Sequence, residues 1–182
     1  MEQNNRSINK EGIKQAIRAL LEAIGENPDR EGLKETPARV AKFYQEWLLQ
    51  EYKPTGFESS YDEMVIIKDV RFYSLCEHHL LPFHGTAKIG YIPSGKVLGL
   101  SKIVRILKKH SSKPQIQERL TEEVAAELQA MTDAAGVMVV LEAEHLCMSM
   151  RGVQTPGKTV TSCIKGAFEK AEARQEFLEL TR

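Results

Sequence analysis

Four consecutive residues, Cys76-Glu77-His78-His79, place a thiol, a carboxylate and two imidazoles side by side between apolar segments. Burying such polar side chains without partners costs free energy, and a solvated loop gains nothing from apolar flanks. A bound metal ion would reconcile the two observations. Because Cys76 and His79 are three positions apart, a turn can bring a sulfur and a ring nitrogen to the same ion. The pattern therefore predicts that Cys76 and His79 are metal ligands.

A second cluster, His145-Leu146-Cys147, can complete the ligand set. Zinc usually takes three or four protein ligands, and two thiolates with one imidazole favour zinc over magnesium or calcium. Cys76, His79 and Cys147 would leave the fourth position open to water, as in catalytic zinc sites. His78 and His145 would then remain beside the ion for proton transfer. The alternative is that these side chains only fill the core, which is our interpretation of Cys163.

The totals exclude several classes of protein. The chain has 182 residues with 25 Lys+Arg and 25 Asp+Glu, so its net charge is zero. It lacks the excess of positive charge that is typical of proteins that bind nucleic acid. No apolar run approaches the roughly 18 residues of a membrane span, and the polar segment from Met1 to Lys10 lacks the apolar core of a secretory signal. Three cysteines, an odd number, argue against a disulfide framework. We expect a soluble cytoplasmic protein.

Two helices come first among the elements that would position these residues. Asn9 can cap a helix that ends at Gly25, and Thr36-Pro37 begins a second helix. Their apolar faces could close on each other, on the rest of the chain or on a neighbouring subunit. A loop-like stretch follows over residues 53–62. We assign residues 1–62 to an N-terminal tail and helical pair, and residues 63–182 to the domain that carries the predicted ligands.

The remaining pattern predicts an α+β domain. Strand-like and helical segments follow in the order ββααββα, and short connections favour antiparallel hairpins. The strands are expected at residues 64–73, 86–92, 137–150 and 158–163, and the helices at residues 99–110, 112–136 and 167–180. Within one strand over residues 137–150, His145 and Cys147 would point to the same face. A small sheet has edges that need cover, so we also expect an oligomer.

A further group of residues could bind an anion. Ser101 can cap the helix that starts at Gly99, and Lys102 and Arg105 share one face near its beginning. A hydroxyl, two cations and free N–H groups at a helix start form an anion site, although the same residues would also form an ordinary solvated cationic face. Glu118, in the first turn of the following helix, could simply complement the helix dipole.

Taken together, these motifs resemble the GTP cyclohydrolase I family over residues 10–180. The matching stretches are Cys76-Glu77-His78-His79, Gly90-Tyr91-Ile92-Pro93, Gly99-Leu100-Ser101-Lys102, Pro114-Gln115-Ile116-Gln117-Glu118-Arg119-Leu120-Thr121, and His145-Leu146-Cys147 with Arg151-Gly152-Val153. The resemblance implies the tunnelling fold, a small antiparallel sheet with helices on one face, and a toroidal homodecamer with active sites between subunits. It also implies zinc-dependent conversion of GTP and water to 7,8-dihydroneopterin triphosphate and formate, which opens tetrahydrofolate and pterin biosynthesis.

The resemblance also assigns roles to individual residues. It implies that Cys76, His79 and Cys147 bind Zn²⁺ and that His78 and His145 are the acid/base pair. It further implies that Glu118, with Gln117 beside it, reads guanine. The implied triphosphate clamp consists of Ser101, Lys102, Arg105 and Arg151. Lys88 departs from the family, in which many members have histidine at this position, but it lies outside the implied ligand set.

Three other functions share some of these features. A nucleoside deaminase also uses zinc held by Cys and His, but its H-x-E…P-C-x-x-C signature is absent. A nitrile reductase of the same fold would use a thiol nucleophile without zinc and would need NADPH, and the additional histidines disfavour it. A zinc-stabilised pterin-binding module without activity would have no use for the pair His78 and His145.

Overall fold

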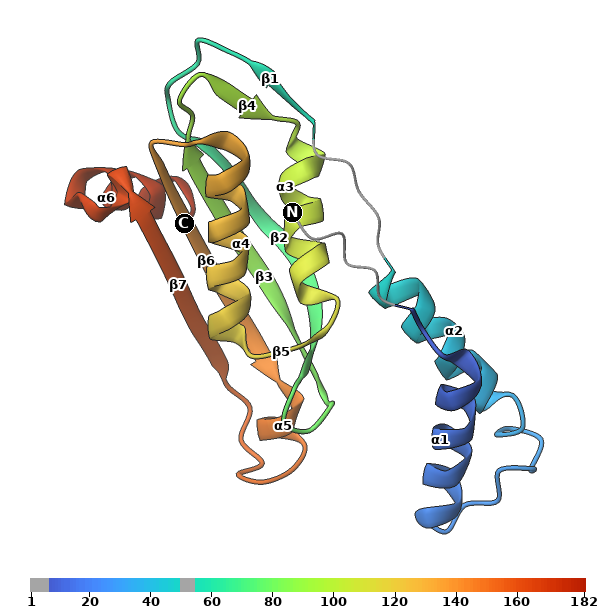
Figure 1. The fold of residues 1–182 in the computed structure, drawn as a ribbon. Coiled ribbons are helices and arrows are strands. Elements are labelled where there is room, and N and C mark those ends of the chain that lie inside the picture. The colour runs from blue at the N-terminus through green and yellow to red at the C-terminus, as the bar shows by residue number, and fades with distance from the viewer. Residues whose placement is uncertain (1–6, 50–54) are drawn as a thin grey trace. The chain divides into compact units, whose positions relative to one another are not determined.

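A computed structural model describes residues 7–49 and 55–182 of the chain (Figure 1). The chain divides into two compact units, residues 1–51 and 52–182. Most of the expected N-terminal tail and the start of the expected loop over 53–62 lie outside the described residues. Within the described ranges, no helix combines the length and the apolar character that crossing a membrane requires.

The first unit is a pair of helices, α1 (Lys10–Ala23) and α2 (Thr36–Leu48), which pack against each other. Asn9 caps α1 as expected, because its side chain accepts a hydrogen bond of 2.9 Å from the N–H of Gly12. The connection between the helices is tied back to α1 by Arg18, whose guanidinium forms a bidentate pair with Asp29.

The second unit is built on a five-stranded sheet with the strand order β5-β2-β3-β6-β7 (Figure 1). Its strands are β2 (Val65–Cys76), β3 (Pro82–Ile92), β5 (Pro114–Gln115), β6 (Gly136–His145) and β7 (Lys158–Gly166). Neighbouring strands are antiparallel, except that β5 runs parallel to β2. A separate sheet pairs β1 (Gly56–Glu58) with β4 (Lys96–Leu98), so residues 56–58 form a strand inside the expected loop.

Helices α3 (Leu100–Ser111) and α4 (Gln117–Thr132) cover one face of the five-stranded sheet and enclose the main core (Figure 1). Because side chains alternate along a strand, Val139 and Leu141 of β6 belong to this core, whereas Met138 packs with Phe168 and Phe177. Those two aromatic residues come from the 3₁₀-helix η1 (Ala167–Glu169) and the closing helix α6 (Ala171–Leu180). The arrangement confirms the predicted α+β class and agrees with the tunnelling fold that the resemblance implied.

The predicted cap of α3 and the predicted start of α4 are wrong. Ser101 lies within the first turn of α3 and does not cap it, because the helix already begins at Leu100. Pro114 begins the short strand β5 and pairs with Leu75 of β2. Proline pushes the residue before it towards extended backbone, which suits a strand better than a helix start. Helix α4 therefore begins only at Gln117.

The predicted ends of α4 and β6 are also wrong. Helix α4 ends at Thr132, and the capping residue Asp133 adopts a left-handed φ of 48° that aspartate tolerates. Gly136 instead begins β6, where a Cβ atom would lie 2.8 Å from the backbone nitrogen of Ala167. Strand β6 ends at His145, where its pairing with β3 ends, and its pairing with β7 ends one residue earlier, at Glu144. The chain then turns into the short helix α5 (Leu146–Ser149).

Candidate metal centre

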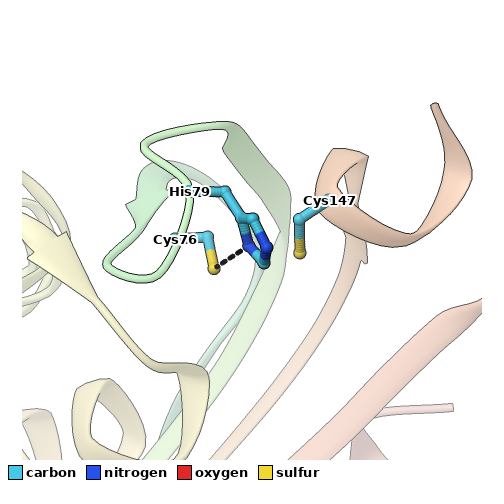
Figure 2. Close-up of side chains that lie close together, drawn as sticks. All are labelled: Cys76, His79 and Cys147. Carbon is cyan, nitrogen blue, oxygen red and sulfur yellow. Dashed lines mark hydrogen bonds between the residues drawn. The ribbon is translucent and has the colours of Figure 1, made fainter. Parts of the chain in front are cut away.

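Cys76, His79 and Cys147 come together at one end of the sheet (Figure 2). One potential ligand atom from each side chain lies within 4.8 Å of the other two. Cys76 is the buried last residue of β2, His79 lies in the turn between β2 and β3, and Cys147 lies in α5. The structure therefore brings together the three residues predicted as ligands, although Cys147 approaches from a helix and not from the expected strand.

The turn between β2 and β3 is closed by its own backbone. The carbonyl of Cys76 accepts hydrogen bonds from the N–H groups of His79 and Leu80, at 3.3 and 2.8 Å. Leu80 has a φ of 54°, a left-handed conformation that costs a non-glycine residue on the order of 1–3 kcal/mol. This conformation lets the chain reverse so tightly that His79 lies beside Cys76, with Nδ1 of His79 3.8 Å from Sγ of Cys76.

The electrostatics of the cluster suit a cation. Burial raises the pKa of the Cys147 thiol, and the neighbouring thiol of Cys76 raises it further. The Cys147 thiol therefore resists ionisation as long as no cation balances the charge. Thiolates are the form that binds metals, so a bound ion would offset this cost. The three side chains could hold a metal ion, and two sulfurs with one imidazole match the donors that zinc prefers.

The two histidines predicted to transfer protons lie in the β2–β3 turn and at the end of β6. Nδ1 of His78 lies 3.9 Å from Sγ of Cys76, and the ring of His78 meets that of His79 edge-on. His145, the last residue of β6, stacks on Phe83 with ring centroids 4.6 Å apart and an interplanar angle of 3°. The two imidazoles thus come from different elements, and that of His78 lies beside the candidate ligand Cys76.

The surroundings of His145 favour its neutral form. Burial lowers the pKa of His145, whereas the nearby carboxylate of Glu118 acts to raise it. A histidine with a lowered pKa stays neutral, and so able to accept a proton, over a wider range of pH. Gln117, the residue before Glu118, is buried and its Oε1 lies 2.7 Å from Nε2 of His145. Glu118 itself is exposed at the start of α4.

The residues predicted to bind the triphosphate are divided between two places. Nη1 of Arg151 lies 3.0 Å from Nε2 of His79, so this cation borders the candidate metal centre. Helix α3 begins at the opposite end of the sheet and leads at its C-terminal end to β5, which pairs with β2 beside Cys76 (Figure 1). A helix rises about 1.5 Å per residue, which puts the first turns of α3 roughly 10–15 Å from that end. These turns carry Ser101, Lys102 and Arg105.

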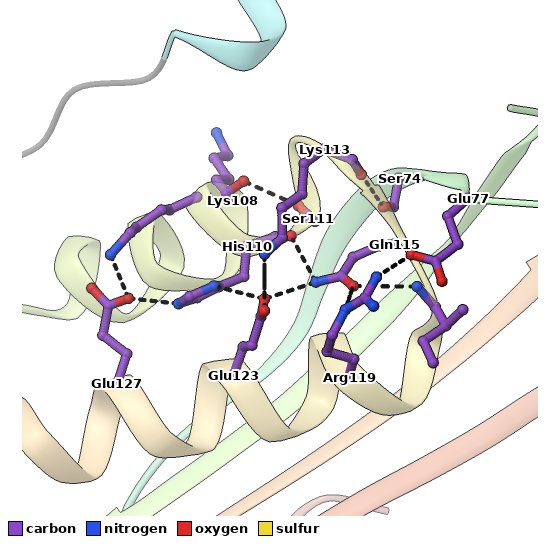
Figure 3. A network of polar contacts seen from close by, with 12 residues as sticks. Ser74, Glu77, Lys108, His110, Ser111, Lys113, Gln115, Arg119, Glu123 and Glu127 are labelled. Carbon is purple, nitrogen blue, oxygen red and sulfur yellow. Dashed lines mark hydrogen bonds and ion pairs between the residues drawn. The ribbon is translucent and has the colours of Figure 1, made fainter. Parts of the chain in front are cut away.

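A polar network joins α3 to α4 (Figure 3), and the sequence pattern did not predict it. His110 bridges two carboxylates of α4, with Nδ1 3.0 Å from Glu123 and Nε2 2.5 Å from Glu127. Glu123 also accepts hydrogen bonds from Lys113 and from the side-chain amide of Gln115. His110 therefore links helix α3 to helix α4.

The network continues to the β2–β3 turn through Arg119. Its Nε donates to Oε1 of Gln115 at 2.7 Å, and its guanidinium also pairs with Glu77, the residue between Cys76 and His78. The N–H of Glu77 donates to the backbone carbonyl of Gln115 at 3.0 Å. Arg119 thus reaches the turn that carries two of the candidate ligands. The recurrence of charged residues at positions 119, 123 and 127 was a signal for this polar face of α4.

The fold and the site define an α+β protein with a candidate metal centre of two cysteines and one histidine, with His78 beside Cys76 and His145 at the end of the strand that precedes Cys147. A family model described as GTP cyclohydrolase I matches residues 13–182. The GTP cyclohydrolase 1 of Aquifex aeolicus (strain VF5) is 55% identical over 181 residues, which cover 97% of this chain and 98% of that protein. The GTP cyclohydrolase 1 of Bacillus subtilis (strain 168) is 51% identical over 183 residues, 96% of each chain. The chain belongs to the GTP cyclohydrolase I family of enzymes.

This membership confirms the family resemblance drawn from the motifs. Among solved structures, the archaeosine synthase QueF-Like in the apo form is similar with a TM-score of 0.43 and 17% identity. The similarity covers 54% of this chain and 91% of that one.

Proposed function

We propose that this chain is a zinc-dependent hydrolase that converts GTP and water to 7,8-dihydroneopterin triphosphate and formate, the first step of tetrahydrofolate and pterin biosynthesis. The observation that carries the proposal is the convergence of Cys76, His79 and Cys147 from distant segments, with His145 at the adjoining strand end. Family membership supports GTP as the substrate. The ligand set needs free thiols, which a reducing cytoplasm maintains, so we place the enzyme there.

The two histidines would carry the protons of the reaction. Zinc, when bound, would act as a Lewis acid and lower the pKa of a bound water to about 7. Addition of water at C8 of guanine needs a proton at the adjoining ring nitrogen, which His78 and His145 are suited to exchange. One water opens the ring to a formamide and a second releases formate. Closure of the pterin ring returns one water, so the net reaction consumes one.

Glu118 is the residue to which we assign recognition of the base. Its exposed carboxylate can accept hydrogen bonds from N1–H and from the exocyclic amine of guanine at the same time. Adenine lacks that pair of donors, so the carboxylate would favour GTP over ATP. Gln117 precedes Glu118, but its side-chain amide is already engaged within the chain, and we therefore do not assign it to the base.

The triphosphate clamp requires a second subunit in this proposal. Ser101, Lys102 and Arg105 lie at the other end of α3 from the candidate metal centre of the same chain, whereas Arg151 borders it. We infer that α3 of a neighbouring subunit supplies the first three. Strand β7 supports self-association, because it forms an edge of the described sheet and exposes Val160. The resemblance implies that the assembly is a toroidal homodecamer.

Incubating the purified, zinc-loaded protein with GTP tests the proposal. We expect release of formate and, after oxidation, a fluorescent pterin, with both lost on chelation and restored by zinc. His78→Ala and His145→Ala should keep the zinc and lose turnover, because they remove proton carriers and leave the ligands. Zinc-loaded protein that releases no formate from GTP would overturn the proposal and favour a binding module, and zinc-independent reduction of a nitrile by NADPH would favour the reductase.

A further inference from the structure

Gln117 is the first residue of α4, and only 1% of it is exposed. Its amide nitrogen Nε2 lies 3.1 Å from the carbonyl oxygen of Leu141 and 3.0 Å from that of Thr159. The same nitrogen lies 3.1 Å from Oγ1 of Thr161. Leu141 belongs to β6 and both threonines to β7, so this single side chain links the start of the helix to two strands.

These contacts decide which way the amide faces. A carbonyl oxygen can only accept hydrogen bonds, so the carbonyls of Leu141 and Thr159 require the NH₂ group of Gln117 on their side. The reverse orientation would set three oxygens against one another and leave buried polar groups unpaired, at about 1–3 kcal/mol for each group. Oε1 of Gln117 must therefore point the other way, where it lies 2.7 Å from Nε2 of His145.

The orientation of Gln117 determines where His145 carries its proton. Oε1 has no hydrogen, so the 2.7 Å contact is a hydrogen bond only when Nε2 of His145 is the donor. Neutral imidazole has a single N–H, so Nδ1 is then the acceptor. Phe83, stacked on the ring, restricts its tilt. Oγ1 of Thr161, which contacts Nε2 of Gln117, also lies 2.7 Å from Oγ1 of Thr121. This second contact holds Thr161 in place beside the NH₂ group of Gln117.

We propose that Gln117 is a positioning residue that holds neutral His145 as the Nε2–H tautomer and leaves Nδ1 as the atom that accepts a proton. The tautomer is a property of the chain, and only the use of Nδ1 in the reaction rests on the proposed function. Gln117 and Glu118 then divide their work: the first orients a histidine, and the second faces the base. Gln117 acts on turnover and not on recognition of guanine.

Nitrogen NMR of the zinc-loaded protein, labelled with ¹⁵N at histidine, tests the tautomer directly. Protonated and bare ring nitrogens of a neutral imidazole have well-separated chemical shifts, and the signals of His145 are those lost in His145→Asn. At a pH where the ring is neutral, we expect the proton on Nε2 and a bare Nδ1. A proton on Nδ1, or averaging between the two tautomers, in the wild-type protein would overturn the inference whatever the activity.

A pair of variants separates positioning from base recognition. Gln117→Met keeps the length of the side chain and removes the acceptor; we expect mixed tautomers, a kcat lowered on the order of 10–100-fold and little change in KM for GTP. Gln115→Met is the matched control, because Gln115 is equally buried but contacts Glu123 and Arg119 in place of His145. It should leave the tautomer unchanged. A raised KM with an unchanged kcat and tautomer in Gln117→Met would overturn the inference.

The outcomes distinguish this inference from the proposed function. If the wild-type protein shows the Nε2–H tautomer but forms no pterin from GTP, the proposed function fails and the positioning of His145 by Gln117 stands. If an active enzyme shows the Nδ1–H tautomer, the inference fails and the proposed function stands.

Discussion

Three consecutive residues at the start of α4 have three different tasks. Gln117 is buried against His145, Glu118 is exposed, and Arg119 reaches Glu77 in the turn that carries two candidate ligands. Successive residues of a helix are rotated by about 100°, so neighbours in sequence face different surroundings. One short segment can therefore orient the imidazole of His145, face a substrate and support a metal site.

Glu123 should make the stability of the fold depend on pH. Partial burial alone would raise the pKa of Glu123, but the ammonium group of Lys113 and contacts with His110 and Gln115 outweigh it, so the pKa lies below its ordinary value. A carboxyl group with a lowered folded-state pKa adds stability above its unfolded pKa and loses it as the pH falls through the folded value. We expect Glu123→Gln to destabilise the protein at neutral pH by on the order of 1 kcal/mol.

Thermal unfolding at several pH values measures this effect. The difference in melting temperature between wild type and Glu123→Gln should be largest near neutral pH. It should narrow as the pH falls below the ordinary pKa of glutamate and through the lowered pKa of Glu123 in the folded protein. Glu122→Gln, which alters an exposed carboxylate on the same helix, serves as the control. A difference that stays constant across this range would contradict the assignment.

At the residue scale, unusual chemistry was predictable from sequence and ordinary chemistry was not. Cys76, His79 and Cys147 could be grouped because thiols and imidazoles are rare and have few uses in common. The role of Gln117 could not be predicted, because two of its partners are backbone carbonyls of β6 and β7. Every residue has a backbone carbonyl, so the sequence does not indicate which ones lie near Gln117. The charged stripe on α4 was visible in the sequence, but its partner His110 was not.

The β2–β3 turn is the element on which the candidate ligands depend most. It is supported from outside by β5, which pairs with the end of β2 so that Gln115 lies opposite Cys76. The sequence did not predict strand β5, because Ser112-Lys113-Pro114 resembles the start of a helix. The strand-like pattern through residue 150 was misleading for a similar reason: β6 stops at His145 where its pairing partners stop, and Cys147 reaches the cluster from α5.

Arg119 gives a test of that support. Arg119→Met keeps much of the apolar stem and removes the contacts with Gln115 and Glu77. The turn should then hold its ligands less firmly, and we expect the affinity for zinc to fall on the order of 10–100-fold. Competition with a chelator of known affinity measures the change. Arg71→Met, at an exposed position of β2, is the control, and equal zinc affinity in both variants would show that Arg119 does not support the site.

At the scale of the whole molecule, one chain holds only part of the site that we propose. The candidate metal centre, His145 and Glu118 gather at one end of the sheet, whereas Ser101, Lys102 and Arg105 lie at the start of α3. The sequence predicted these residues from their types and from a family resemblance. It could not place them relative to one another, because that depends on the direction in which α3 crosses the sheet.

Mixed oligomers test whether subunits share a site. Arg105→Ala and His145→Ala should each be nearly inactive alone, since each lacks one part of every site. When the two are co-expressed and mixed oligomers are isolated by two different tags, some sites combine an intact α3 with an intact His145, and activity should return. Mixed oligomers that remain as inactive as either parent would show that each chain supplies its whole site.

The central claim is that Cys76, His79 and Cys147 hold one zinc ion and leave a position for water. X-ray absorption at the zinc edge of the wild-type protein measures this most directly. We predict two sulfur ligands at about 2.3 Å, one imidazole nitrogen at about 2.0–2.1 Å and one further light atom from solvent. Fewer than two sulfurs at the metal, or a fourth ligand from the protein in the position meant for water, would contradict the account.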